Sequence, residues 1–224
     1  SEYDGPARAL DEYLHPADTF VLEKANFVLP ISCVKCHGPA ERHVRYHREN
    51  PGDPTARHIV GIGDLTRNQQ VEVCGFCHTP PGAVVRPPFS FRPGDAYSDF
   101  IEPAAVDFTE TDPHATQAPY LTASQCFKRT PSMTCTTCHD PHRNQRGDLG
   151  MFSRLCRECH EPSSGMHCTR TPTQEGAAAD CIDCHMPRQT SSALRVVGQR
   201  GETLPLRMRN HWIKVHELEG STGP

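Results

Sequence analysis

Apolar residues are sparse along this chain, and few stretches keep a helical or strand period for long. The most apolar stretch covers residues 20–31, and Pro30 interrupts it. Residues 79–94 are rich in Pro and Gly, which excludes a long helix or a central strand there. That tract still holds valine and phenylalanine side chains, so we expect an ordered wrap and not a disordered linker.

Short helices are predicted at three places. Residues 41–49 can form a helix that Pro51 ends. The Thr-Arg-Asn-Gln sequence that begins at Thr66 has the spacing of a capping box ahead of an apolar run. The helix it starts is expected to run into residues 74–78. A further short helix is predicted over residues 115–122.

The composition agrees with a thin core. Of 224 residues, 36% are hydrophobic, 21 are Pro and one is Trp. The formal charge is −4, and no basic run with interleaved aromatics occurs, so we expect no nucleic-acid partner. No apolar run approaches the roughly 20 residues of a membrane span, so we expect no transmembrane segment.

Five copies of the pattern C-x-x-C-H carry the candidate chemistry. Two thiols on a tight turn can attach to the two vinyl groups of haem, and the following His binds iron from the proximal side. The predicted attachment thiols are those of Cys33, Cys36, Cys74, Cys77, Cys135, Cys138, Cys156, Cys159, Cys181 and Cys184. The predicted proximal ligands are His37, His78, His139, His160 and His185. We therefore expect five covalently bound c-type haems as cofactors.

Zinc is the alternative for paired cysteines, because two C-x-x-C pairs can share one tetrahedral ion. Five pairs is an odd number for such sharing. A zinc site also has no need of a His directly after the second Cys, whereas all five copies have one. The complete pattern favours haem.

Five haems change the expected fold, because each is a large apolar plate that can replace missing side-chain core. We expect a mainly α protein with extensive irregular coil and few or no strands, a multihaem cytochrome c wrapped around a chain of five haems. The pentahaem domain is predicted over residues 33–216, between an N-terminal arm of residues 1–32 and a tail of residues 217–224. Folding should depend on haem attachment.

Nine of the fourteen His residues lie outside the motifs, and this surplus favours a second His on each iron. The predicted distal ligands are His43, His114, His142, His167 and His211. His15 and His58 are held in reserve or as ligands to another subunit, with ordinary surface positions as the alternative. His47 is expected on a polar helix face and His216 near a frayed end. Two His ligands imply a six-coordinate, low-spin iron with no vacant position.

Two cysteines remain outside the motifs, Cys126 and Cys168, and we predict a disulfide between them. The alternative is a pair of buried thiols. Twelve Cys in a chain of this size point away from a reducing cytosol. Because haem is attached outside the cytoplasm, we expect an extracellular or periplasmic protein, and we expect this chain to be its mature form after signal-peptide removal.

Longer segments around the motifs carry a family resemblance. SCVKCHGPAERHV, RPPFSFRPGD, SQCFKRTPSMTCTTCHDPH, DCIDCHMP and MRNHWI resemble segments of bacterial multihaem c-type cytochromes. These cytochromes are related to the tetrahaem carriers that accept electrons from hydroxylamine oxidation. The resemblance covers most of residues 31–216 and implies His43 and His142 as distal ligands. This chain lacks the tetratricopeptide repeats and the additional N-terminal haem motif that such proteins often carry.

Electron transfer is the predicted function, with redox proteins as partners. The alternative is a multihaem oxidoreductase that acts on a small nitrogen or sulfur compound at an open iron. Related nitrite reductases mark that haem with C-x-x-C-K, which this chain lacks. We also expect copies of the chain to assemble head-to-tail into a conductive filament, in which His15 of the arm reaches a terminal haem of the next copy. The alternative is a monomer whose arm folds back on its own first haem.

Overall fold

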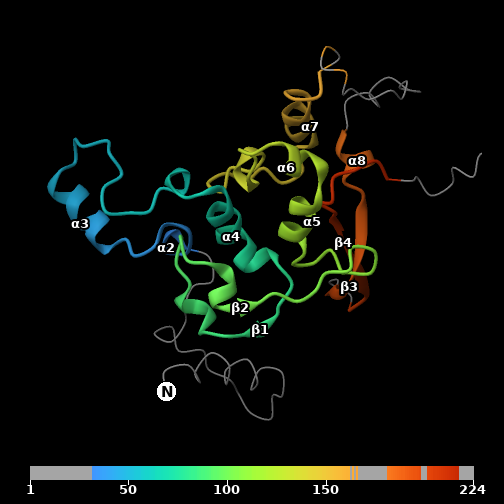
Figure 1. Ribbon diagram of the computed structural model, residues 1–224, viewed down its shortest axis with the longest axis horizontal. Coiled ribbons are helices and arrows are strands. Elements are labelled where there is room, and N and C mark those ends of the chain that lie inside the picture. Colours follow the sequence, from blue (N-terminus) through green and yellow to red (C-terminus); the bar gives the residue numbers. More distant parts are fainter. Residues whose placement is uncertain (1–31, 162, 164, 166–180, 198–200, 217–224) are drawn as a thin grey trace, which may run out of the picture.

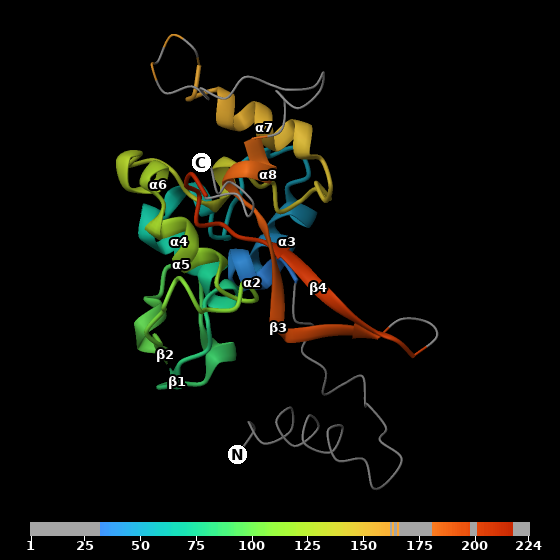
Figure 2. The same ribbon diagram turned by 90° about the vertical axis from the view of Figure 1, so that its right-hand side faces the viewer.

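The computed structural model describes residues 32–161, 163, 165, 181–197 and 201–216 of the chain. Within these ranges the chain is a mixture of short helices, irregular coil and two small two-stranded sheets (Figures 1 and 2). None of the described helices has both the length and the apolar character needed to cross a membrane. The predominance of helix over strand and the large share of coil are confirmed.

The α-helices have between five and twelve residues. They are α2 (Cys33–His37), α3 (Glu41–Glu49), α4 (Arg67–His78), α5 (Gln117–Ala123), α6 (Gln125–Arg129), α7 (Leu149–Arg157) and α8 (Cys181–His185). Single turns of 3-10 helix cover Ile62–Asp64, Pro88–Ser90, Tyr97–Asp99 and Cys135–Thr137. The strands are β1 (Ala83–Val84), β2 (Ile101–Glu102), β3 (Arg188–Val197) and β4 (Thr203–Arg209).

The three predicted helices are present, and two of them begin where predicted. α3 covers the nine predicted residues. α4 begins with a complete capping box, in which the Thr66 side chain accepts from the Gln69 N–H and the Gln69 side chain accepts from the Thr66 N–H. α5 begins two residues later than predicted, and α8 ends at His185, ahead of Pro187. These signals are local, so they can be detected in the sequence.

The hydrophobic core of the described chain is thin and divided into two clusters. Val71, Ala118, Leu121 and Phe127 form one cluster, in which α4, α5 and α6 meet. Phe91, Tyr97, Phe100 and Ile101 form the other cluster, and Phe76 packs against it. α4 contributes to both, so it connects them. Two clusters of four buried residues are a small core for a chain of this length.

Arg67 fixes α4 to the segment that leads to the third motif. Its guanidinium lies 3.6 Å from the centre of the Phe127 ring. Its Nη2 donates to the Phe127 carbonyl at 2.5 Å, and its Nε donates to the Met133 carbonyl at 2.9 Å. One side chain therefore ties the first turn of α4 to two points of the chain ahead of Cys135.

The hairpin of β3 and β4 is the main difference from the predicted fold. The strands pair antiparallel from Arg188 opposite Arg209 to Val197 opposite Thr203, with an irregularity between Thr190 and Arg195. The expectation of few or no strands is wrong for this segment, in which Pro205 of β4 lies opposite Arg195 of β3. The hairpin depends on a contact with a distant part of the chain, which local patterns do not reveal.

That contact is made by Asp112, whose carboxylate binds the irregular part of β3. It accepts from the hydroxyls of Ser191 and Ser192 at 2.9 and 2.8 Å, and from the N–H groups of Ser192 and Ala193. It also accepts from the His114 N–H at 2.8 Å. Burial opposes ionisation of Asp112, but these hydrogen bonds outweigh it and hold its pKa below the usual range.

Candidate haem-binding site

Each C-x-x-C-H motif lies on or beside a helical turn. The first and fifth motifs are α2 and α8, the second ends α4, the third begins on the turn at Cys135–Thr137, and the fourth follows from α7. The N–H of His139 donates to the Cys135 carbonyl, and that of His160 donates to the Cys156 carbonyl, both at 3.0 Å. This turn places two thiols and one imidazole together, as haem attachment requires. None of the ten motif thiols is fully buried.

Thiols of consecutive motifs are neighbours. Cys74 and Cys135 form a side-chain hydrogen bond, which raises the pKa of Cys74 and lowers that of Cys135. Burial raises the pKa of Cys36, and the charges of the second motif's thiols raise it further. Burial also raises the pKa of Cys156 to about 11, with Cys181 as the next cause. Cys138 of the third motif also contributes to the Cys156 shift, so each motif lies near the next one along the chain.

A buried hydroxyl ties the fourth and fifth motifs together. The N–H of Cys181 donates to the Ser153 hydroxyl at 3.1 Å, and Ser153 is fully buried on α7. An open surface depression of about 380 Å³ lies beside the third motif, lined in part by Cys138, His139 and Leu155.

Two predicted distal histidines lie opposite motif histidines. The ring centroids of His37 and His142 are 5.9 Å apart, with planes 10° from parallel. Those of His139 and His211 are 6.0 Å apart, with planes at 31°. Metal–nitrogen bonds are about 2 Å long, so two imidazoles on opposite sides of one ion have centroids about 6 Å apart. Both pairs fit that separation.

In two further pairs of histidines, the charge of one ring contributes to the pKa shift of the other. Desolvation lowers the pKa of His78, which keeps some exposed surface, and the next cause is His114. Burial also lowers the pKa of His216, and His185 contributes to that shift. His114 was a predicted distal ligand, whereas His216 was expected near a frayed end. The hairpin brings His216 back beside the fifth motif, where the Asn210 N–H donates to the Pro187 carbonyl at 3.0 Å.

Backbone carbonyls determine which ring nitrogen carries the proton in two motif histidines. His37 Nδ1 lies 2.8 Å from the Val60 oxygen, and His185 Nδ1 lies 2.9 Å from the Lys214 oxygen. A carbonyl only accepts, so each Nδ1 carries the proton and each Nε2 carries the free lone pair. Histidines that bind metals usually have this arrangement. It was not detectable in the sequence, because the carbonyls come from residues more than twenty positions away.

His211 is the predicted ligand with the most enclosed ring. Burial lowers its pKa to about 4, and the His139 charge lowers it further, against a smaller raising effect of a backbone hydrogen bond. Its Nδ1 is buried without a hydrogen-bond partner within the protein. A neutral imidazole with an unpartnered nitrogen, facing a motif histidine, fits an axial ligand.

The remaining predicted ligands are not placed beside a motif histidine. His43 contacts His47 on α3, and His58 lies edge-on to Tyr46. His15 and His167 lie outside the described residues. Cys168 does too, so its predicted disulfide with Cys126 stays a prediction; the Cys126 sulfur lies 3.2 Å from the Ser124 hydroxyl.

The described residues contain no preformed tetrahedral site for zinc. Across the described residues, no group of three or more His, Cys, Asp or Glu side chains is arranged to hold a metal ion.

Comparisons with protein-family models, with curated proteins and with solved structures find no match to this chain. The assignment of its function therefore depends on the site itself.

Proposed function

We propose that this protein transfers electrons through five covalently bound c-type haems, one at each C-x-x-C-H motif. The observation that carries the proposal is the spacing of His37 from His142 and of His139 from His211. Both pairs join a motif histidine to a distant segment at about 6 Å. Such spacing suits two ligands on opposite faces of one iron.

The side chains of the protein have three tasks in this proposal. The motif thiols attach the cofactor, and the motif histidines bind iron through Nε2. The Val60 and Lys214 carbonyls orient two of those rings by accepting from Nδ1–H. Bound haem supplies a one-electron iron couple. Because two histidines occupy both axial positions, the arrangement favours electron transfer over reaction with a substrate.

The distal ligands proposed from ring geometry are His142 for the first motif and His211 for the third. His114 is proposed for the second motif, because its charge contributes to the lowered pKa of His78. His216 is not proposed as a ligand, because its Nε2 lies 3.1 Å from the Trp212 carbonyl and therefore carries the proton. For the fourth motif, His167 stays the predicted ligand. His43, which was also predicted as a distal ligand, faces His47 instead of a motif histidine.

The proposed location is extracytoplasmic, where haem attachment takes place, and the proposed partners are other redox proteins. Head-to-tail assembly through His15 is a separate proposal. It is tested by imaging the parent and the His15→Ala variant. The mechanism is wrong if the variant forms the same filaments, and the assembly itself is wrong if the parent stays monomeric at high concentration.

The experiment that tests the main proposal measures the mass and the spin state of the purified holoprotein. We expect a denatured mass that includes five haems and a visible spectrum without a high-spin band. Addition of cyanide or nitrite should leave the spectrum unchanged, because no iron has an open position. A spectral shift on ligand addition would favour the multihaem oxidoreductase, and a mass without haem would refute both.

A further inference from the structure

One face of the β3–β4 hairpin consists of exposed residues. Arg195 of β3 lies opposite Pro205 of β4. Two residues further along β3, Val197 lies opposite Thr203 on the same side of the sheet. Arg207 alternates with Pro205 along β4, so it faces this side as well. All five residues are exposed, and we call them the hairpin face. Figure 2 shows that the hairpin extends beyond the helices.

The hairpin face is basic and partly apolar. Arg195 and Arg207 supply two positive charges, and the face contains no acidic residue. The Arg207 guanidinium donates to the Arg188 carbonyl at 3.2 Å, which leaves its charge unneutralised. The side chain of Val197 is 71% exposed. Exposed apolar surface beside charge of one sign suits a contact with a partner of the opposite charge.

A second exposed surface has the opposite charge. Glu102 of β2 and Asp99 of the turn before it are both exposed. Val84 of β1 and the following Val85 are 64% and 59% exposed. We call these four residues the acidic surface. No Lys or Arg occurs in residues 93–127, so the stretch of chain that carries both carboxylates has only acidic charges.

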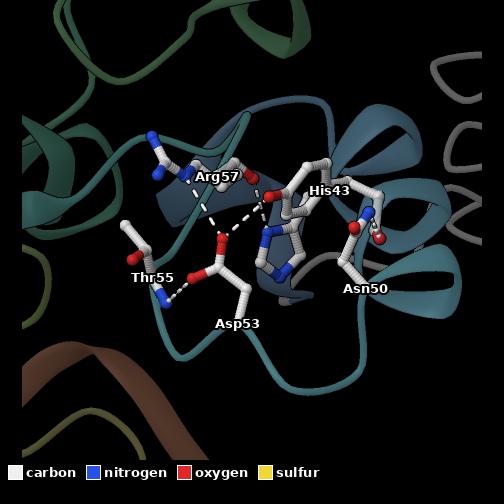
Figure 3. Close-up of polar contacts among 6 residues, drawn as sticks. His43, Asn50, Asp53, Thr55 and Arg57 are labelled. Atoms are coloured by element: carbon white, nitrogen blue, oxygen red, sulfur yellow. Dashed lines mark hydrogen bonds and ion pairs between the residues drawn. The ribbon is translucent and has the colours of Figure 1, made fainter.

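Neither surface has the internal ion pairs that neutralise charge around α3. There, Asp53 pairs with Arg57 Nε at 3.4 Å and accepts from the Tyr46 hydroxyl at 2.8 Å (Figure 3). Among the described contacts, no ion pair involves a residue of the hairpin face or of the acidic surface. Arg86, the cation that follows the two valines, lies over the Phe100 ring at 5.9 Å. Both surfaces therefore keep their charge for a partner.

The two surfaces lie apart within one molecule. Both views show β1 and β2 separated from the end of the hairpin that carries Val197 (Figures 1 and 2). We infer that the hairpin face of one copy binds the acidic surface of a second copy. The arginines meet the carboxylates, and the exposed valines of the two surfaces pack together. Because two different surfaces meet, the contact is heterologous and can repeat from copy to copy.

This interface deepens the proposed head-to-tail assembly, but it uses neither His15 nor any haem ligand. It goes beyond the proposed electron transfer, because it names the surfaces through which copies recognise each other. Opposite charges chiefly speed the encounter and select the partner, while the apolar residues slow dissociation. The contact should therefore be sensitive to salt.

The test is sedimentation velocity of the purified holoprotein over a range of concentrations at low salt. The variants are Arg195→Glu, Glu102→Arg and, as a matched charge reversal on α3, Arg48→Glu, which is exposed and outside both surfaces. The parent and Arg48→Glu should form larger species as the concentration rises. The other two should associate at least about tenfold more weakly, because each sets like charges against each other. In about 1 M salt, which reduces the range of charge interactions to about 3 Å, association of the parent should weaken.

A mixture of the two weakened variants tests the pairing of the surfaces. An equimolar mixture should associate again, because the intact hairpin face of Glu102→Arg meets the intact acidic surface of Arg195→Glu. Three outcomes would overturn the inference: a parent that stays monomeric at high concentration, single variants that associate as the parent does, or a mixture that associates no better than its components. A failure of the proposed electron transfer appears separately, in the haem mass and spin state, which these surface substitutions leave unchanged.

Discussion

The ring of His211 faces the ring of His139 at a centroid distance of 6.0 Å, although the two residues lie in distant parts of the sequence. His211 is the second residue after β4, and the N–H of the intervening Asn210 donates to the Pro187 carbonyl at 3.0 Å. The antiparallel hairpin therefore returns the chain to the motifs at this point. Its position relative to the third motif depends on the hairpin being formed.

Replacing His211 should change the spin state of one haem in five. In His211→Ala we expect a high-spin signal in electron paramagnetic resonance and a gain of cyanide binding, because one axial position becomes vacant. His58→Ala is the control, since His58 is exposed and contacts Tyr46. A fully low-spin spectrum for His211→Ala would remove His211 from the set of ligands.

Replacing Asp112 should loosen the hairpin and the turn that holds His114. Asp112→Asn leaves several N–H and O–H donors without a charged acceptor, so we expect a loss of about 1–3 kcal/mol in the free energy of unfolding. The second haem should also acquire partial high-spin character, because the turn that holds His114 loosens. Asp107→Asn is the control, because Asp107 bonds only within its own turn among the described contacts.

Much of the local structure was predictable from the sequence. The capping box at Thr66 and the stop ahead of Pro51 are signals within a few residues, and the helices agree with them. The hairpin and the place of His216 were not predictable. The hairpin is bound by Asp112, which accepts from residues about eighty positions later in the chain. No period or spacing in the segment itself encodes that contact.

Removing the Arg67 guanidinium should destabilise the contact between α4 and the third motif. Arg67→Ala removes two hydrogen bonds and the contact with the Phe127 ring, for an expected loss of about 2–3 kcal/mol in stability. Arg67→Lys should retain only part of the lost stability, because an ammonium group lacks the planar, forked geometry of the guanidinium. Chemical denaturation measures both. Equal stability of the two variants would contradict the role of the guanidinium geometry.

The haem-free chain should not keep the fold of the holoprotein. Its two small hydrophobic clusters leave too little buried apolar surface to offset the conformational entropy of the chain. We expect apoprotein produced without haem attachment to show fast amide hydrogen exchange throughout and no cooperative thermal transition. A cooperative transition at a temperature near that of the holoprotein would refute the dependence on haem.

The predicted disulfide between Cys126 and Cys168 can be tested by alkylation of the denatured, non-reduced holoprotein. We expect neither residue to be labelled. By chain entropy the cross-link adds about 4 kcal/mol to stability. Labelling of both cysteines would show that they remain thiols.

The hydrogen bond between the Cys74 and Cys135 thiols bears on the order of events during maturation. Two thiols in contact can be joined by an oxidant, and an extracytoplasmic compartment supplies oxidants. Such a disulfide would consume one attachment thiol from each of two motifs and would block both at once. Under the proposed function, haem attachment at the second and third motifs has to precede oxidation, or a thiol reductant has to keep this pair reduced until attachment is complete.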